Sequence, residues 1–115
     1  MEDLTVVLPA YNEEQAIGLV IDGTRLAAPG SKILVVDNNS SDNTRRISLG
    51  KGVTLIDEPK RGKGNAIQTA LTHIDTPYVI MVDSDYTYPL EHIKPIYGFL
   101  AMGHYDVVKI GRAHV

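Results

Sequence analysis

The sequence predicts a single α/β domain in which a mostly parallel sheet is flanked by helices. Short apolar runs alternate along the 115-residue chain with segments whose apolar residues recur every three or four positions. Such alternation is typical of βαβ units, whose strands lie parallel. The runs themselves are almost continuously apolar, as expected for strands that are covered on both faces. A chain of this length can form one domain with a core of its own.

The predicted strands are the short apolar and β-branched runs. The first covers residues 4–8 and is ended by Pro9. The next three cover residues 32–36, 53–56 and 78–82, and a fifth begins at residues 105–108. Residues 109–115 do not continue that fifth strand, and they read like a translated sequencing adapter. We therefore expect the native part to be residues 1–108, followed by a non-native tail at 109–115.

The predicted helices cover residues 13–27, 64–74 and 90–102. Asn12 followed by Gln15 resembles a capping box, which places the start of the first helix there. The second helix carries an apolar face at helical spacing. Pro89 suits the first position of the third helix, and Glu91 suits its first turn, where a carboxylate meets the positive end of the helix.

Composition excludes several classes of function. The formal net charge of −3 does not favour a nucleic-acid-binding surface. The chain has no cysteine, which excludes disulfides and thiolate metal sites. It begins with acidic residues rather than a signal peptide, and no apolar run approaches the roughly 20 residues of a membrane span. We expect a soluble, cytoplasmic protein.

Polar residues gather directly after four of the predicted strands. These segments are residues 9–14, 37–42, 57–65 and 83–85. Because parallel strands end at one edge of the sheet, the four segments are expected to form one contiguous rim. Taken singly, each segment is also explained by turn chemistry: Asn12 as a helix cap, residues 37–41 as an Asx-rich turn, residues 62–65 as a flexible loop. Four together favour a site.

Asp83 and Asp85 are the candidate metal ligands of this rim. They place two hard oxygen ligands just past a buried strand, where Mg²⁺ or Mn²⁺ is commonly held against a phosphorylated ligand. The alternative is that both carboxylates cap the next helix. A divalent cation here would neutralise the charge that grows as a nucleoside diphosphate departs.

Three cations, Lys60, Arg61 and Lys63, stand beside two glycines where a helix is expected to begin. A helix N-terminus with nearby cations favours a diphosphate. Asp37, after the second strand, is an acceptor-only group that suits a base N–H or a ribose hydroxyl. The sequence lacks the glycine spacing of a dinucleotide-binding fingerprint and of a P-loop.

Four ordered motifs carry a family resemblance: PAYNEE, VVDNNSSDNT, RGKGNA and VDSDYTYP. Together they resemble the N-terminal half of family 2 glycosyltransferases, most closely dolichyl-phosphate mannose synthase and related polyprenyl-phosphate glycosyltransferases. The resemblance runs from Leu4 to about Val108. It implies the Rossmann-like GT-A nucleotide-diphospho-sugar transferase fold, truncated after about five strands, with residues 1–108 as its nucleotide-sugar-binding half.

The resemblance also implies roles for individual residues. Asp37 would contact the base or ribose, Lys63 a phosphate or the base, and Asp83 and Asp85 the metal and the diphosphate, with Ser84 between them at the substrate. The nucleotide base pocket would be lined by Pro9, Ala10, Tyr11 and Glu13. The tyrosines near the acidic pair, Tyr86, Tyr88 and Tyr97, are either stacking partners for a sugar or base, or half-buried packing.

The activity implied is metal-assisted, inverting transfer of a sugar from a GDP-mannose or UDP-glucose type donor to an acceptor, a polyprenyl phosphate. Mg²⁺ or Mn²⁺ would be the cofactor. The general base on the acceptor would come from a later part of the protein, where membrane helices are also common in the family, so the cytoplasmic face of a membrane is an expected location. The alternative is a catalytically inactive half-domain that binds nucleotide and metal.

Overall fold

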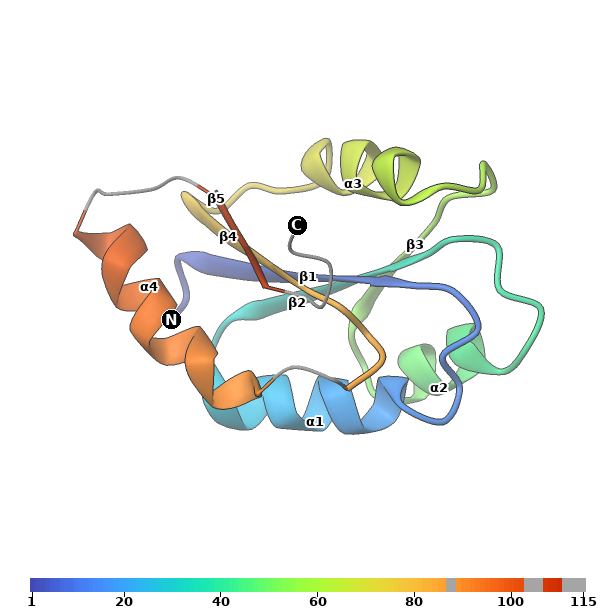
Figure 1. The fold of residues 1–115 in the computed structure, drawn as a ribbon, viewed down its shortest axis with the longest axis horizontal. Coiled ribbons are helices and arrows are strands. Elements are labelled where there is room, and N and C mark those ends of the chain that lie inside the picture. Colours follow the sequence, from blue (N-terminus) through green and yellow to red (C-terminus); the bar gives the residue numbers. More distant parts are fainter. Residues whose placement is uncertain (87–88, 103–106, 111–115) are drawn as a thin grey trace.

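The computed structural model describes residues 1–86, 89–102 and 107–110, the last four as backbone alone. It forms a five-stranded, wholly parallel sheet with the strand order β3-β2-β1-β4-β5 (Figure 1). The prediction of an α/β fold with a mostly parallel sheet is confirmed. The strands are β1 (Leu4–Ala10), β2 (Lys32–Asp37), β3 (Thr54–Asp57), β4 (Tyr78–Val82) and β5 (Val107–Ile110).

Helices cover both faces of the sheet. They are α1 (Ile17–Ala27), α2 (Thr44–Gly50), α3 (Lys63–Leu71), the 3₁₀ turn η1 (Leu90–His92) and α4 (Ile93–Ala101). Figure 1 shows α1, α2 and α4 on one face and α3 on the other. Each face has its own apolar cluster, built around Ile17, Val20 and Ile21 under α1 and around Ala66 and Ala70 under α3. In the described part of the chain, no helix is long and apolar enough to cross a bilayer.

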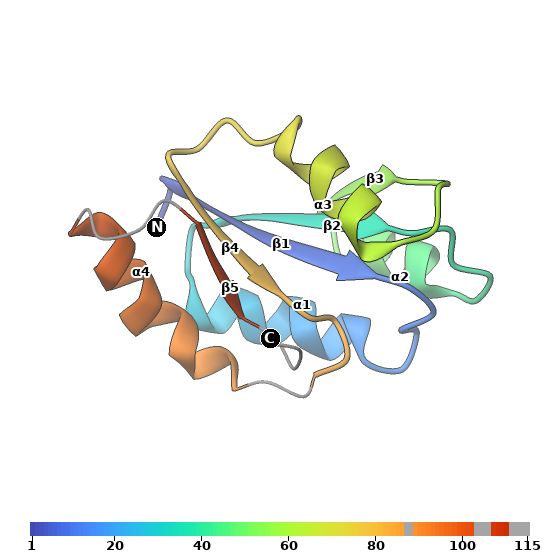
Figure 2. The ribbon, with the colours of Figure 1, turned by 45° about the horizontal axis from the view of Figure 1, so that its top comes forward.

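The strand order reverses between β1 and β4. From β1 the chain moves outward through β2 to β3, and it then returns to place β4 and β5 on the other side of β1 (Figure 2). At the carboxyl edge, Ala10 pairs in register with Asp37, and Asp37 with Asp57. Connections leave opposite faces at such a reversal, so a crevice opens between the carboxyl ends of the two central strands.

Pro9 does not end the first strand, as the sequence predicted, because β1 continues to Ala10. Pairing of β1 with β4 stops at Val7, whereas pairing with β2 continues through Pro9. The Pro9 carbonyl faces the β4 side, where it accepts a hydrogen bond from Ser84 Oγ at 2.8 Å. A residue's N–H and C=O point to the same side of a strand, so the missing N–H costs no bond to β2.

The predicted capping box at Asn12 is wrong, because α1 begins at Ile17 with Ala16 as its N-cap. Asn12 has a φ of 51°, in the left-handed region that Asn tolerates. Its side-chain oxygen accepts the backbone N–H of Ser41 at 2.8 Å, and its own N–H donates to Ser40 Oγ at 2.9 Å. Asn12 thus joins the β1–α1 loop to the loop after β2 instead of capping the helix.

Helix α2 is absent from the sequence prediction. Its fully buried residues are Thr44 and Ser48, two hydroxyl side chains, and Ile47 packs against the core only partly buried, so no repeated apolar spacing reveals the helix. The Ser48 hydroxyl donates to the Thr44 carbonyl at 2.8 Å, which satisfies it inside the helix. Short helices with polar buried faces are therefore invisible to a test based on apolar spacing.

Thr44 anchors the start of α2 to the β1–α1 loop. Its hydroxyl donates to Asp42 Oδ1 at 2.6 Å and accepts the Glu13 N–H at 2.8 Å. Burial alone would raise the pKa of the Asp42 carboxyl, but hydrogen bonds from the Thr44 side chain and N–H and from the Glu14 N–H outweigh it and lower that pKa.

Other boundaries differ by a few residues. β2 and β3 each extend one residue further, to Asp37 and Asp57, and the predicted third helix begins as η1, with Pro89 as the N-cap rather than the first helical residue. Tyr105 and Asp106 lie outside the described residues. The prediction that residues 109–115 do not continue the fifth strand is wrong for Lys109 and Ile110, because the backbone of β5 pairs with β4 over residues 107–110. The non-native character of residues 109–115 stays a prediction.

We expect Thr44→Val to lower the free energy of unfolding by about 1–2 kcal/mol, because it leaves the Glu13 N–H and Asp42 without their buried partner. Equilibrium urea unfolding measures the effect. Thr54→Val makes the same change at an exposed position of β3 and should leave stability nearly unchanged. Equal stability of the two variants would contradict the anchoring role of Thr44.

Candidate functional site

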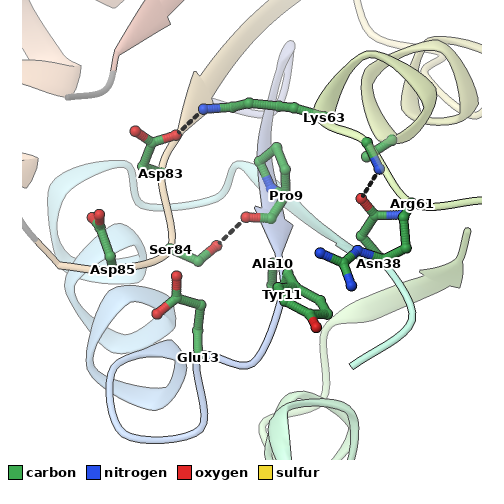
Figure 3. A pocket seen from close by; sticks show the side chains of 12 residues that line it. Pro9, Ala10, Tyr11, Glu13, Asn38, Arg61, Lys63, Asp83, Ser84 and Asp85 are labelled. Atoms are coloured by element: carbon green, nitrogen blue, oxygen red, sulfur yellow. Dashed lines mark hydrogen bonds and ion pairs between the residues drawn. The ribbon is translucent and has the colours of Figure 1, made fainter. Parts of the chain in front are cut away.

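A cleft of about 270 Å³ opens at the carboxyl ends of β1 and β4, where the strand order reverses (Figure 3). The walls come from the ends of β1, β2 and β4 and from the start of α3. Carboxylates and cations face each other across it. The lining residues are Pro9, Ala10, Tyr11, Glu13, Asn38, Arg61, Gly62, Lys63, Ala66, Asp83, Ser84 and Asp85.

The predicted site residues converge on this cleft, with one exception. Pro9, Ala10, Tyr11, Glu13, Lys63, Asp83, Ser84 and Asp85 all line it. Asp37 is not among the lining residues. Most of the polar residues predicted to form one rim at the carboxyl edge therefore do lie together. Their roles toward a ligand stay predictions.

Asp37 is the last residue of β2 and is buried, with 4% of its surface exposed. Its Oδ1 accepts no hydrogen bond from any residue that the structure describes. A buried carboxylate oxygen without a partner costs folding free energy, and such groups are uncommon in native proteins. Its neighbour in sequence, Asn38, lines the cleft.

Tyr11 and Arg61 form one end of the cleft. The Arg61 guanidinium lies over the Tyr11 ring, with its Cζ 3.6 Å from the ring centroid. This is a cation–π contact, which is stronger where water is excluded. Tyr11 is 39% exposed, so a flat ring is presented at the surface of the cleft. A planar ligand group can stack here.

Asn38 holds the loop that carries the cations. Its Nδ2 donates to the carbonyls of Glu58 and Lys60 at 3.0 and 2.9 Å, and its Oδ1 accepts the Gly62 N–H at 3.1 Å. All its amide groups are thus used on one loop, and the residue is 6% exposed. Asn38 was seen in the sequence only as part of an Asx-rich turn, because a side chain that bonds to distant backbone has no local signature.

Glu58 braces the same loop from its other end. Its carboxylate accepts hydrogen bonds from the Thr69 hydroxyl of α3 and, at 2.9 Å, from the Lys60 N–H. These bonds, that of Thr69 first, lower the pKa of the Glu58 carboxyl. The loop is therefore tied to β2 through Asn38 and to α3 through Glu58, which fixes where its cations begin.

Gly62 starts α3 at the edge of the cleft. Its φ of 128° lies in a region that only glycine adopts without strain, and no side chain caps the helix in the described structure. Gly62 and Lys63 both line the cleft, so the start of α3 borders it, with the Lys63 side chain extending from that point (Figure 3). A helix start of this kind, flanked by cations, suits a phosphate group.

The acidic pair lies at the other end of the cleft, directly after β4. Asp83 Oδ1 accepts an ion-paired hydrogen bond from Lys63 Nζ at 2.7 Å, and its side chain is only 15% exposed. Ser84 is buried and bonds back to Pro9, which joins the ends of β4 and β1. Figure 3 shows the Glu13 and Asp85 carboxylates turned toward the same side of the cleft as Asp83.

The donor set suits a hard divalent cation in part. In the part of the chain that the structure describes, no three carboxylates or imidazoles come close enough together to enclose a metal. Mg²⁺ and similar ions are often held by one or two carboxylates together with substrate phosphates. Asp83 already binds one cation, the Lys63 ammonium. Because the chain offers few carboxylates here, the site fits a metal that a diphosphate helps to coordinate.

Tyr97 and Tyr86, two of the three tyrosines suggested for stacking, do not line the cleft. The Tyr97 hydroxyl donates to Asp3 Oδ1 at 2.7 Å, and its ring makes an edge contact with Tyr78 at 6.1 Å. This bond to Asp3 raises the pKa of Tyr97, whose role is packing at the amino edge of the sheet. Tyr86 is exposed and does not line the cleft, while Thr87 and Tyr88 lie outside the described residues.

Fold and site together define a class of α/β protein, with a charged cleft at the switch point of a parallel sheet. The family profile of Glycosyl transferase family 2 matches residues 5–115. The chain belongs to this family, and the resemblance that its four motifs carry is confirmed.

Two similar proteins differ in how much of their length this chain spans. A dolichyl-phosphate hexose transferase of Haloferax volcanii is 38% identical over 93% of this chain, which spans 46% of that protein. Protein RfbJ of Shigella flexneri is 33% identical over 92% of this chain, which spans 82% of it. The chain thus spans less than half of the first relative and most of the second.

A solved structure shows the same fold. Glucosyl-3-phosphoglycerate synthase from Mycobacterium tuberculosis, in complex with Mn²⁺, UDP and glucosyl-3-phosphoglycerate, superposes with a TM-score of 0.76 at 28% identity. The match covers 87% of this chain and 40% of the synthase. The GT-A fold expected from the motifs is confirmed.

We expect Asn38→Asp to loosen the loop, because a carboxylate oxygen would then face the carbonyls of Glu58 and Lys60. The amide hydrogens of Lys60 and Gly62 should exchange with solvent at least about tenfold faster, as local opening becomes easier. Hydrogen exchange followed by NMR measures this. Asn39→Asp makes the same change at the next, exposed residue and should not alter exchange; similar rates in both variants would contradict the role of Asn38.

Proposed function

We propose that this chain is the nucleotide-sugar-binding half of a metal-dependent, inverting glycosyltransferase. The single observation that carries the proposal is the cleft at the β1–β4 switch point. The Tyr11 ring lies at one end, Lys63 and the start of α3 lie in the middle, and an acidic pair lies at the other end, while the buried Asp37 stands next to the cleft-lining Asn38. A nucleotide base, a diphosphate and a divalent metal would find suitable partners at these three places, in that order.

The nucleotide base belongs at the Tyr11 end in this proposal. Tyr11, with Pro9 and Ala10 beside it, offers an apolar surface for a flat ring. The Asp37 carboxylate can accept a hydrogen bond from a base N–H or a ribose hydroxyl, which gives its unpartnered Oδ1 a function. Glu13 lies on the side of the acidic pair (Figure 3), where in this proposal it would face the ribose or the phosphates.

The diphosphate and the metal belong at the middle and far end. Asp83 and Asp85 would hold Mg²⁺ or Mn²⁺, with the start of α3 and Lys63 on the diphosphate. The metal would act as a Lewis acid that stabilises charge on the departing diphosphate. The Mn²⁺ and UDP of the solved synthase support this assignment. Ser84 acts on the ligand indirectly by fixing the acidic pair to β1.

The transferred sugar would pass to a polyprenyl phosphate. An oxygen of the acceptor phosphate forms the new bond to the anomeric carbon as the bond to the diphosphate breaks and its electrons leave with the nucleoside diphosphate. The relative that acts on dolichyl phosphate supports this acceptor class. We place the general base in the part of longer relatives that this chain does not span, and the reaction in the cytoplasm at a membrane face.

The alternative is a half-domain that binds nucleotide and metal without transfer. The observation that favours it is coverage, since the chain spans 40% of the solved synthase and 46% of the dolichyl-phosphate relative. Both functions require the same nucleotide and metal site in residues 1–108. They differ in whether any sugar is transferred.

We expect the chain to bind UDP or GDP at least about tenfold more tightly with Mn²⁺ than with EDTA, because the metal bridges the carboxylates and the diphosphate. Isothermal titration calorimetry with each nucleotide measures this. Asp85→Asn should remove most of the metal-dependent gain.

The control for this experiment is Asp75→Asn, which removes a carboxylate that pairs with Lys32 outside the cleft. It should bind nucleotide as the wild type does. A folded wild-type chain that binds neither UDP nor GDP would overturn the proposed function and its alternative together. Sugar transfer by this chain to a polyprenyl phosphate would decide between them.

We expect Asp37→Asn to weaken nucleotide binding at least about tenfold, because the proposed base or ribose contact uses the carboxylate. The thermal midpoint should be unchanged or higher, because the buried carboxylate oxygen has a cost in the ligand-free chain. Calorimetric titration and thermal unfolding measure the two effects. Asp57→Asn, at the in-register exposed position of β3, is the matched control. Unchanged affinity in Asp37→Asn would contradict a base or ribose contact.

A further inference from the structure

We propose that Lys63 is an exchangeable counter-ion of the metal site. Its ammonium occupies Asp83 in the ligand-free chain, a divalent cation displaces it from that carboxylate, and the displaced ammonium then pairs with the diphosphate. This inference rests on the proposed function and adds to it a competition between a residue of the chain and the metal.

The first support is the ion pair itself. Lys63 Nζ lies 2.7 Å from Asp83 Oδ1, and the Asp83 side chain is 15% exposed whereas that of Lys63 is 42% exposed. The carboxylate is therefore fixed in the cleft wall, while the lysine reaches it from a more exposed position. A metal that binds the Asp83 carboxylate competes with the ammonium for it, because two cations at one carboxylate repel each other.

The second support is that the exchange needs only side-chain rotation. Lys63 is the first residue of α3, and the preceding Gly62 is held through its N–H by Asn38 Oδ1. The backbone is thus fixed at the point from which the side chain extends. In Figure 3 the lysine spans the cleft from the α3 start to Asp83, across the region proposed for the diphosphate. Rotation of the side chain brings the ammonium from one partner to the other.

The other two cations of the loop are placed differently. Arg61 is stacked on the Tyr11 ring, and Lys60 is exposed and outside the cleft lining. Of these three cations, Lys63 is therefore the one that competes directly with a metal for Asp83. The exchange predicts that metal and nucleotide help each other to bind. The metal frees Lys63 to pair with the diphosphate, the diphosphate draws Lys63 away from Asp83, and such coupling is reciprocal.

The test is a titration of the full chain with Mn²⁺ in the absence of nucleotide. Binding is measured as the loss of the EPR signal of free Mn²⁺. Lys63→Met should bind Mn²⁺ about two- to fivefold more tightly than the wild type, the range expected for the loss of a partly exposed ion pair. Its gain in UDP affinity on addition of Mn²⁺ should be smaller than that of the wild type. Lys63→Arg keeps the charge and should bind Mn²⁺ as the wild type does.

Lys60→Met is the matched control, because it removes the same charge from the same loop without touching Asp83. An equal rise in Mn²⁺ affinity in Lys60→Met and Lys63→Met, or no rise in Lys63→Met, overturns the exchange. If the wild type still binds Mn²⁺ and UDP together, the proposed function stands. A folded wild type that binds neither overturns both, and thermal unfolding by circular dichroism establishes that each variant is folded.

Discussion

The reversal of strand order between β1 and β4 is the constraint on which the rest of the structure depends. It sends α1 and α3 to opposite faces of the sheet and leaves the carboxyl ends of the two central strands uncovered. The hydrogen bond from Ser84 to the Pro9 carbonyl holds those two ends together after their ladder has stopped. The acidic pair, Asp83 and Asp85, flanks Ser84 in the sequence, so its position is set by the sheet rather than by a free loop.

The cations are placed by a second set of contacts, which also begins at the sheet. Asn38, one residue past β2, fixes the carbonyls of Glu58 and Lys60 and the N–H of Gly62. This buried side chain therefore controls both the path of the loop and the start of α3. Carboxylates from β4 and cations from the α3 start face each other because two rigid sheet ends support them, which is the arrangement that gives a binding site its precision.

The sequence was sufficient for the sheet and for the polar rim, since both follow from local patterns. Continuous apolar runs identified β4 with its bounds, and the acidic pair after it was recognisable from residue type and position. Features that depend on contacts between distant residues were not predictable. Asn12 is used across loops instead of as a cap, α2 buries hydroxyl side chains, and Asn38 bonds to backbone 20 to 24 residues away in sequence.

Several groups in the cleft or next to it have interactions that a ligand would complete or replace. Asp37 Oδ1, next to the cleft-lining Asn38, is buried without a partner among the described residues, and α3 starts without a side-chain cap. Both features cost stability in the ligand-free chain, whereas the third, the ion pair of Asp83 with Lys63, satisfies its two charges within the chain. In the proposed function a metal-bound nucleoside diphosphate would satisfy the first two and take over the third. Selection for stability alone would remove an unpartnered buried carboxylate oxygen, so its position beside this cleft is itself an argument for a ligand.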